Sequence, residues 1–292
     1  MKILVLLLSF ICMYGCEKSD KLNKTPNKLN KTSIQMKKKT YYLYYTLRGN
    51  YEVFCNGISL SEYIDQDGTA TASEYLNPLI SGKGMQTVSI KINSSDSNIL
   101  SPEYLKGVKI SLYYSENGDE GDLVLVKDFT LKPYNENQPM VFETWSFNAD
   151  VDYENEGPLN SASDLAKEDL HKLSEDVLNK YNEVLSIINS GDANKYSEMY
   201  KDSFKRETTS MYLDTNETQK YINNLKSRVI ASKGFMKPIE GYKININPNN
   251  KIVELTSSKG KPVLYSIDDK RKIKFFSLQL YRSSKTGKLE VY

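Results

Sequence analysis

Histidine and cysteine, the side chains that most often ligate metals or act as nucleophiles, are scarce in this chain of 292 residues. The chain has one histidine, His171, and three cysteines, Cys12, Cys16 and Cys55. Zinc sites are built largely from these two residue types, so the composition argues against one, and it disfavours a cysteine–histidine nucleophile pair. Glycine-rich phosphate loops and Gly-x-Ser-x-Gly elbows are also missing from the sequence. We predict neither a catalytic residue nor a cofactor.

Glu254 and Tyr265 are the residues with the best prospect of lining a pocket. General acid–base chemistry needs a carboxylate or similar group in a dry site. Glu254 lies in the strand-like run "KIVELTS", and Tyr265 lies in "PVLYSI". A lone strand carboxylate lies more often at a sheet edge than in a pocket. The expectation is therefore a protein that is not an enzyme, with a small-molecule pocket as the alternative.

An acidic loop, "ENGDEGD", holds the hard oxygen ligands that calcium prefers. These side chains are Glu116, Asp119, Glu120 and Asp122. A solvated hairpin tip is the commoner role for such a loop, so no metal site is predicted, and calcium is the alternative.

Aromatic residues suggest a binding surface on strands. Tyr42, Tyr44, Tyr113 and Trp145 lie in strand-like runs, where neighbouring side chains point to opposite faces of a sheet. Outward rings suit contacts with proteins or sugars, because they are apolar with a polar tip. Cross-strand packing on an ordinary sheet is the alternative.

The N-terminal segment around Cys16 indicates export and lipid attachment. The run "ILVLLLSFI" is too short to span a bilayer, which needs about 20 apolar residues, and has the length of a signal-peptide core. Cys16 follows the small residue Gly15, whereas Cys12 follows the β-branched Ile11. The segment "MYGC" resembles the lipobox of bacterial lipoproteins. This resemblance implies that residues 1–15 are a signal peptide and that Cys16 carries acyl chains such as palmitate; ordinary secretion is the alternative.

Residues 16–39 are expected to form a tether behind this membrane anchor. After Cys16 the segment holds eight lysines and two acids, a composition typical of disorder. A flexible coil of about 23 residues spans about 26 Å, and its lysines favour an anionic lipid surface. Nucleic-acid binding, the alternative for a lysine run, is not expected of an exported protein.

The charges of the remaining residues indicate two domains. Residues 40–158 carry seven basic and eighteen acidic side chains, a net charge of −11, whereas residues 159–292 carry 23 basic and 17 acidic, a net charge of +6. A change of sign between halves of ordinary domain size favours a separate domain for each half. Cys55 is expected to be a buried strand residue that acts as a small hydrophobe.

Short strand-like runs separated by turn residues predict an antiparallel β-sandwich over residues 40–158. The Asn56–Gly57 pair predicts a tight hairpin turn. From Tyr51 to Ile92, the order of a strand, Asn-Gly, a strand, "LNPLISGKG" and "TVSIKI" resembles jelly-roll domains of the galactose-binding type. The runs expected to form strands are "TYYLYYTLRG", "YEVFCNG", "MQTVSIKIN", "GVKISLYYS", "DLVLVKDFTLK" and "PMVFETWSFNADV".

Residues 159–292 are expected to form an α+β domain. Apolar periodicity predicts a long helix that ends at Gly191. Ser161 and Asp164 resemble a capping box at its start, and Asp192 is expected to cap the helix that follows.

A short strand over residues 206–213, a helix over residues 215–234 and several β runs complete the expected order of elements. This order, with Gly191–Asp192 between the first two helices, resembles the nuclear-transport-factor-two-like cone, in which helices pack on a curved antiparallel sheet. Members include ketosteroid isomerases and polyketide cyclases, which use pocket carboxylates, and proteins that only bind small molecules or partners.

The function predicted from these features is that of a non-catalytic, lipid-anchored protein of a bacterial cell envelope. It would bind a protein or a glycan through the sandwich, the α+β domain or both, as an accessory or toxin-neutralising factor. The alternative is a small-molecule binder or enzyme that uses the pocket of the C-terminal cone.

Overall fold

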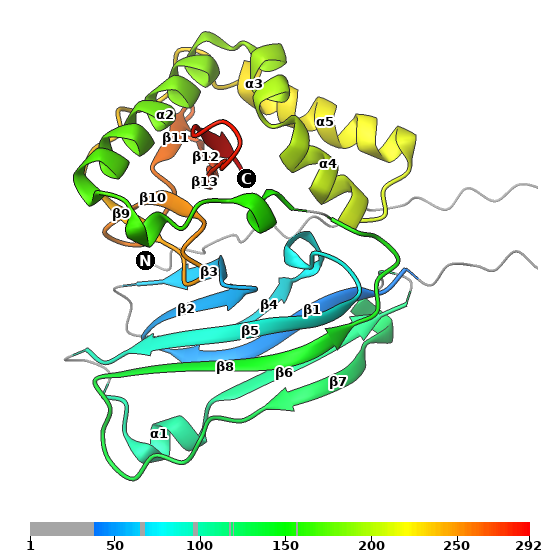
Figure 1. The fold of residues 1–292 in the computed structure, drawn as a ribbon, viewed down its shortest axis with the longest axis vertical. Helices are drawn as coiled ribbons and strands as arrows, with labels where there is room; N and C mark the ends of the chain where they lie inside the picture. The colour runs from blue at the N-terminus through cyan, green and yellow to red at the C-terminus, as the bar shows by residue number, and fades with distance from the viewer. Residues whose placement is uncertain (1–37, 65–67, 96–98, 117, 119, 156) are drawn as a thin grey trace, which may run out of the picture. The chain divides into compact units, whose positions relative to one another are not determined.

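The structure is a computed structural model, and Figure 1 shows its ribbon. It describes residues 38–64, 68–95, 99–116, 118, 120–155 and 157–292, without the side chain of Glu120. The predicted signal peptide, Cys16 and most of the tether therefore lie outside the described residues. The described residues all belong to one compact unit.

The N-terminal part is an antiparallel β-sandwich, as predicted (Figure 1). Sheet A has the strand order β4-β1-β6-β7, and sheet B has the order β3-β2-β5-β8. The strands are β1 (Thr40–Arg48), β2 (Asn50–Cys55), β3 (Ile58–Tyr63), β4 (Thr69–Tyr75), β5 (Gly84–Asn93), β6 (Lys109–Ser115), β7 (Val124–Phe129) and β8 (Met140–Ala149). Short helical turns lie between them: η1 (Asn77–Leu79), α1 (Pro102–Lys106) and η2 (Glu120–Asp122).

The sandwich core forms because alternate side chains of each strand point to the same face of its sheet. Along β1, every second residue is at most 2% exposed, and the residues between them face the other way. Cys55 is fully buried among these core residues, as predicted, and burial raises the pKa of its thiol to about 12. The inward residues include Tyr41, Leu43, Tyr45 and Leu47 of sheet A and Val53, Val88, Ile90, Ile92 and Val141 of sheet B.

The predicted hairpin turn at Asn56–Gly57 connects β2 and β3. Both residues have positive φ angles, 51° and 70°, which is the backbone geometry that an Asn-Gly pair favours in a two-residue turn. Asn56 also fixes the turn to the sheet, because its amide donates to the Leu79 carbonyl at 2.8 Å and its side-chain oxygen accepts from the Thr87 N–H at 2.9 Å.

The C-terminal part consists of helices followed by antiparallel strands, which is the predicted α+β class. One sheet has the order β14-β13-β10-β9, and β11 and β12 form a separate hairpin. The helical elements are η3 (Pro158–Ser161), η4 (Leu165–Lys167), α2 (Leu170–Ser190), α3 (Ala193–Met199), α4 (Lys201–Ser210) and α5 (Thr215–Ile230). The strands are β9 (Tyr242–Ile246), β10 (Val253–Ser257), β11 (Leu264–Ile267), β12 (Ile273–Phe276), β13 (Leu280–Arg282) and β14 (Leu289–Val291).

Helix α2 ends where the sequence predicts but begins later. Gly191 closes it in the left-handed region with a φ of 75°, and Asp192 caps α3 by accepting from the Lys195 N–H at 2.9 Å. The predicted capping box at Ser161 is wrong. Asp169 caps α2 by accepting from the Lys172 N–H at 2.8 Å, while Asp164 caps the short turn η4 instead.

The predicted strand over residues 206–213 is also wrong, because most of this segment belongs to α4. Thr208 tolerates the helix, since it lies on the buried face and its hydroxyl donates to the Phe204 carbonyl one turn earlier at 2.8 Å. The end of the helix then docks on the sandwich, where the Ser210 carbonyl accepts from the side chains of Asn77 and Tyr75, each at 3.2 Å.

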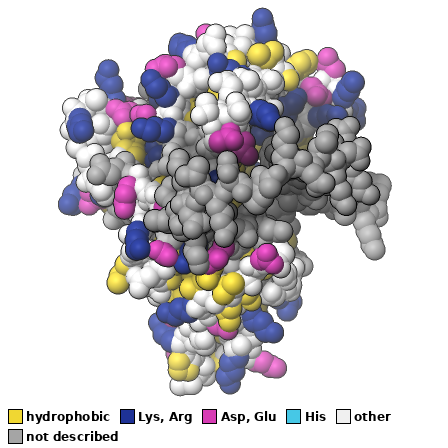
Figure 2. Space-filling model, turned by 90° about the vertical axis from the view of Figure 1, so that its right-hand side faces the viewer, with side chains coloured by type: hydrophobic (Ala, Val, Ile, Leu, Met, Phe, Trp, Pro, Cys, Tyr) yellow, Lys and Arg dark blue, Asp and Glu magenta, His cyan; other side chains and the backbone are white. Residues whose placement is uncertain are grey.

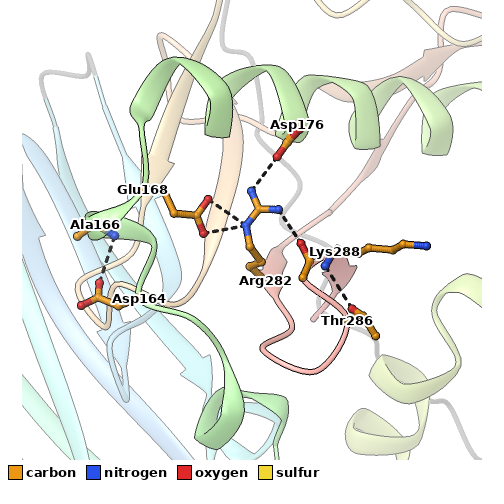
Figure 3. Close-up of polar contacts among 8 residues, drawn as sticks. Asp164, Ala166, Glu168, Asp176, Arg282, Thr286 and Lys288 are labelled. Carbon is orange, nitrogen blue, oxygen red and sulfur yellow. Dashed lines mark hydrogen bonds and ion pairs between the residues drawn. The ribbon is translucent and has the colours of Figure 1, made fainter.

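Arg282 fixes the entry of α2 against the β13–β14 hairpin (Figure 3). Its Nε donates to both carboxylate oxygens of Glu168, at 2.7 and 2.9 Å, and its Nη2 donates to Asp176 at 2.9 Å. Its Nη1 donates to the Gly287 carbonyl at 3.1 Å. A planar guanidinium satisfies such a set of acceptors, whereas an ammonium does not have the geometry to do so.

Direct contacts join the sandwich to the α+β part. Ile58 of β3 packs with Ile252 and Tyr281 in a small apolar cluster of their own. Gly57 lies so close to Asn249 that a side chain on Gly57 would place its Cβ 2.9 Å from the Asn249 Cβ. Each part also has its own hydrophobic core. The division into two domains at residue 158 stays a prediction.

Candidate functional site

Three of the four predicted platform residues lie on the outer face of sheet A. Tyr42 and Tyr44 alternate with core residues of β1, and Tyr113 of β6 lies directly opposite Tyr42. The rings of Tyr44 and Tyr113 meet edge to face, with centroids 5.2 Å apart. Trp145 does not join them, because it packs against the sandwich core, where it stacks on Phe129 with centroids 5.4 Å apart.

Tyr42 is too buried to contact a ligand, since it is only 8% exposed. Its ring contacts Tyr75, with centroids 5.6 Å apart, and the Tyr75 hydroxyl donates to the last residue of α4. The α+β part therefore covers this end of the tyrosine row. Tyr44 and Tyr113 stay half-buried, with part of each ring accessible.

Apolar side chains of β7 extend this surface beyond the tyrosines. Leu125 lies directly opposite Tyr113, so the two side chains share a face of the sheet. Leu125 is 49% exposed, and its neighbour Val126, at a bulge in the pairing, is 38% exposed. We call Tyr44, Tyr113, Leu125 and Val126 the sheet A patch. Figure 2 shows hydrophobic side chains gathered over the sandwich, in the lower half of that view.

The sequence predicts the tyrosines of the sheet A patch but not its aliphatic half. The run "DLVLVKDF" is expected as a strand, and apolar residues in a strand are normally assigned to a core. What exposes Leu125 and Val126 is the position of β7 at the edge of sheet A, which the sequence of β7 does not encode.

The sheet A patch has charged neighbours of both signs, because the exposed Arg48 and Lys109 share its face of the sheet and the acidic β6–β7 connection separates Tyr113 from Leu125 in the chain. The connection between β6 and β7 contains the predicted calcium candidates, of which Glu116 and Asp122 are described. Asp119 and the side chain of Glu120 lie outside the described residues, so the calcium alternative stays untested. Among the residues that the structure does describe, no group of three or more His, Cys, Asp or Glu side chains is placed to hold a metal ion.

Glu254 lines a cavity of about 180 Å³ between the sandwich and the α+β part. One wall is β3, from Ser59 to Glu62, and the opposite wall includes Glu254, Thr256 and Gln279. The cavity exists because β10 and β13 pair only at Val253–Leu280 and then separate. Tyr265, the other predicted pocket residue, does not line this cavity and packs on Phe275 in the β11–β12 hairpin.

Tyr181 of α2 bridges the gap at the base of this cavity. Its hydroxyl accepts from the Leu255 N–H at 2.8 Å and donates to the Leu278 carbonyl. These are backbone groups that a continuous sheet would have paired with each other. Burial, the main cause, raises the pKa of the Tyr181 phenol, which therefore stays neutral and able to donate.

The charged side chains that line the cavity are both acidic. Glu62 has a side chain only 8% exposed and forms an ion pair of 2.9 Å with Lys243 of β9. Glu254 accepts a hydrogen bond from Gln279, but burial, the largest cause, raises its pKa from 4.5 to about 7, and the negative charges of Glu62 and Glu52 act in the same direction. Nothing in the sequence connects Glu62 with Glu254, which lies almost 200 residues later.

Comparison with known proteins gives no match, whether with family models, with curated protein sequences or with solved structures. Of the helices within the described part of the chain, none is long and apolar enough to cross a membrane. The side chain of His171 is 83% exposed, and its Nδ1 lies 3.5 Å from a carboxylate oxygen of Glu175 on the same helix.

Proposed function

We propose that the protein is a non-catalytic lipoprotein of a bacterial cell envelope that binds a protein partner through the sheet A patch. Acyl chains on Cys16 would anchor it, and the tether would hold the sandwich within reach of the membrane surface. Within this proposal, the sandwich serves as a jelly-roll binding module of the galactose-binding type and the C-terminal part as a cone-like α+β module.

The observation that carries this proposal is the exposure of Leu125 and Val126 beside the paired rings of Tyr44 and Tyr113. Contiguous exposed apolar side chains are uncommon on soluble proteins and mark interaction sites. Tyrosine is enriched at protein interfaces because its ring buries a large area at a small entropic cost. Aliphatic side chains beside the rings favour a protein partner over a glycan.

The net charge of the sandwich further restricts the class of partner. Residues 40–158, which include the sandwich, carry a net charge of −11. An anionic lipid surface would be repelled by this part of the molecule. The partner that fits is a protein with an apolar contact surface and a net positive charge.

Recovery of partners from producing cells tests the binding site. The full-length lipoprotein would be cross-linked in intact cells and purified in detergent, as wild type and as the double variant Leu125→Lys/Val126→Lys. Ile273→Lys is the matched control, since Ile273 is an exposed apolar strand residue of the α+β part, at 54% exposure. The proposal requires a partner that is lost from the double variant and kept by the control. Equal recovery from all three proteins, or recovery of none, contradicts it.

Membrane fractionation tests the anchor separately. Cys16→Ala should release the protein from membranes and abolish incorporation of labelled palmitate, since two or more acyl chains are needed for stable anchoring. Cys12→Ala, four residues earlier, should leave both unchanged. Palmitate uptake by the Cys16→Ala variant would contradict the proposed anchor.

A further inference from the structure

The cavity between β3 and β10 has features of a ligand site that are independent of the sheet A patch. Its volume of about 180 Å³ exceeds the roughly 10–15 Å³ that one water molecule needs on the same measure. It can therefore accept several waters or one small organic molecule. Its walls come from both parts of the chain, a location where ligand sites occur frequently.

The packing around Glu62 shows that this acidic wall is tightly built. Gly260, in the turn between β10 and β11, lies against the Glu62 carboxylate, and a Cβ on Gly260 would come within 2.7 Å of it. The φ angle of Gly260 is +71°, which also favours glycine. The Glu62 side chain is thus held in place by the Gly260 backbone on one side and by Lys243 on another.

The charges that face the cavity sum to an excess of negative charge. Glu254 of β10, Glu62 of β3 and Glu52 of β2 are the carboxylates whose charges reach the site. Lys243 pairs with Glu62, and Lys91 of β5 pairs with Glu52 at 2.8 Å. Tyr181 is neutral, and Gln279 and Thr256 add uncharged polar groups to the lining.

We propose that this cavity binds a small molecule that carries an ammonium group, with Glu254 as the carboxylate that receives it. Lys243 acts on Glu254 only at a distance, because its ion pair is with Glu62. A desolvated carboxylate that has no ion pair of its own among the described residues is costly to keep ionised, and a bound ammonium supplies a countercharge in direct contact. Ser59, Thr256 and Gln279 would accept or donate hydrogen bonds to the remainder of the ligand. An anionic ligand is disfavoured, because both charged lining side chains repel it.

Proton linkage gives the binding a defined pH dependence. The ammonium binds the ionised form of Glu254, so binding lowers the pKa of this carboxyl and releases a proton at neutral pH. Affinity should therefore increase as the pH rises from about 6 to about 8, a range in which an aliphatic amine stays protonated.

Isothermal titration with putrescine, 1,4-butanediol and succinate tests the proposal. These probes have the same four-carbon backbone length and differ in charge. At pH 8, putrescine should bind saturably, the other two should not, and Glu254→Gln should weaken putrescine at least about tenfold. Glu198→Gln, a change at a side chain 79% exposed on α3, should bind like the wild type.

Three results would overturn the proposal. They are absence of saturable putrescine binding, equal binding of putrescine and butanediol, and equal affinity of the wild type and Glu254→Gln. Circular dichroism of both glutamate variants checks that they are folded. Because the assay does not involve the sheet A patch, its failure leaves the proposed function unaffected.

Discussion

Replacing Glu254 by glutamine should stabilise the folded protein in a strongly pH-dependent way. Burial, then the neighbouring charges of Glu62 and Glu52, raises the pKa of this carboxyl from 4.5 to about 7. The folded protein thus holds the proton more tightly than the unfolded chain. Below a pH of about 4.5, Glu254 is protonated in both the folded protein and the unfolded chain, so it does not lower stability. As the pH rises from about 4.5 to about 7, the unfolded chain loses this proton first, and the folded protein becomes progressively less stable.

The magnitude follows from the shift in pKa. Since one pKa unit corresponds to about 1.4 kcal/mol, a rise from 4.5 to about 7 amounts to about 3 kcal/mol of lost stability above neutral pH. Glutamine has the same shape and no charge, so Glu254→Gln avoids this cost. The variant should match the wild type near pH 4 and exceed its free energy of unfolding by up to about 3 kcal/mol at pH 8.

Urea unfolding at several pH values, followed by circular dichroism, measures this difference. Glu198→Gln is the control, because Glu198 is well exposed and its replacement should change stability by less than about 0.5 kcal/mol at any pH. A difference between Glu254→Gln and wild type that is constant from pH 4 to pH 8 would refute the raised pKa that burial gives Glu254.

Three further substitutions test how the scaffold is held together. Tyr181→Phe removes the hydroxyl that satisfies the Leu255 N–H and the Leu278 carbonyl. It should lower the free energy of unfolding, measured in urea, by about 2–4 kcal/mol. A loss under about 1 kcal/mol would contradict the bridging role. Arg282→Lys keeps the charge but loses most of the guanidinium contacts, and should lower the free energy of unfolding by about 2 kcal/mol, whereas an unchanged value would mean that the cluster contributes little. Gly57→Ala should lower the melting temperature because of its positive φ and the contact with Asn249, and a temperature equal to that of wild type would show that the junction tolerates a side chain there.

Much of the fold is predictable from local patterns. The Asn56–Gly57 turn and the ends at Gly191 and Asp192 depend on residues that adopt particular backbone angles or accept from nearby N–H groups, so their signals are short-range. The alternation along β1 likewise predicts its two faces, because a strand in a sandwich buries every second residue.

The errors arise where several local signals compete or tertiary contacts override them. Asp164 and Asp169 are both adequate caps, and only the path of the chain decides that α2 begins after Asp169. Thr208 favours a strand by propensity, but packing of α4 and docking of Ser210 on Asn77 place it in a helix.

The candidate sites are predictable only in part for a related reason. Tyr44, Tyr113 and Glu254 stand out by residue type and position, but their surroundings come from distant segments. The exposure of Leu125 depends on the order of strands in sheet A. The second acid of the cavity, Glu62, comes from β3, far from Glu254 in the sequence.

Site-specific photo-cross-linking in living cells tests the proposed partner binding most directly. A photoreactive amino acid at position 125 of the full-length lipoprotein should give a discrete adduct with another protein on irradiation. The same residue at position 273, also exposed on a strand, should give none. Absence of a protein adduct from position 125, or an adduct formed equally from both positions, would contradict the assignment of the sheet A patch as a protein-binding surface.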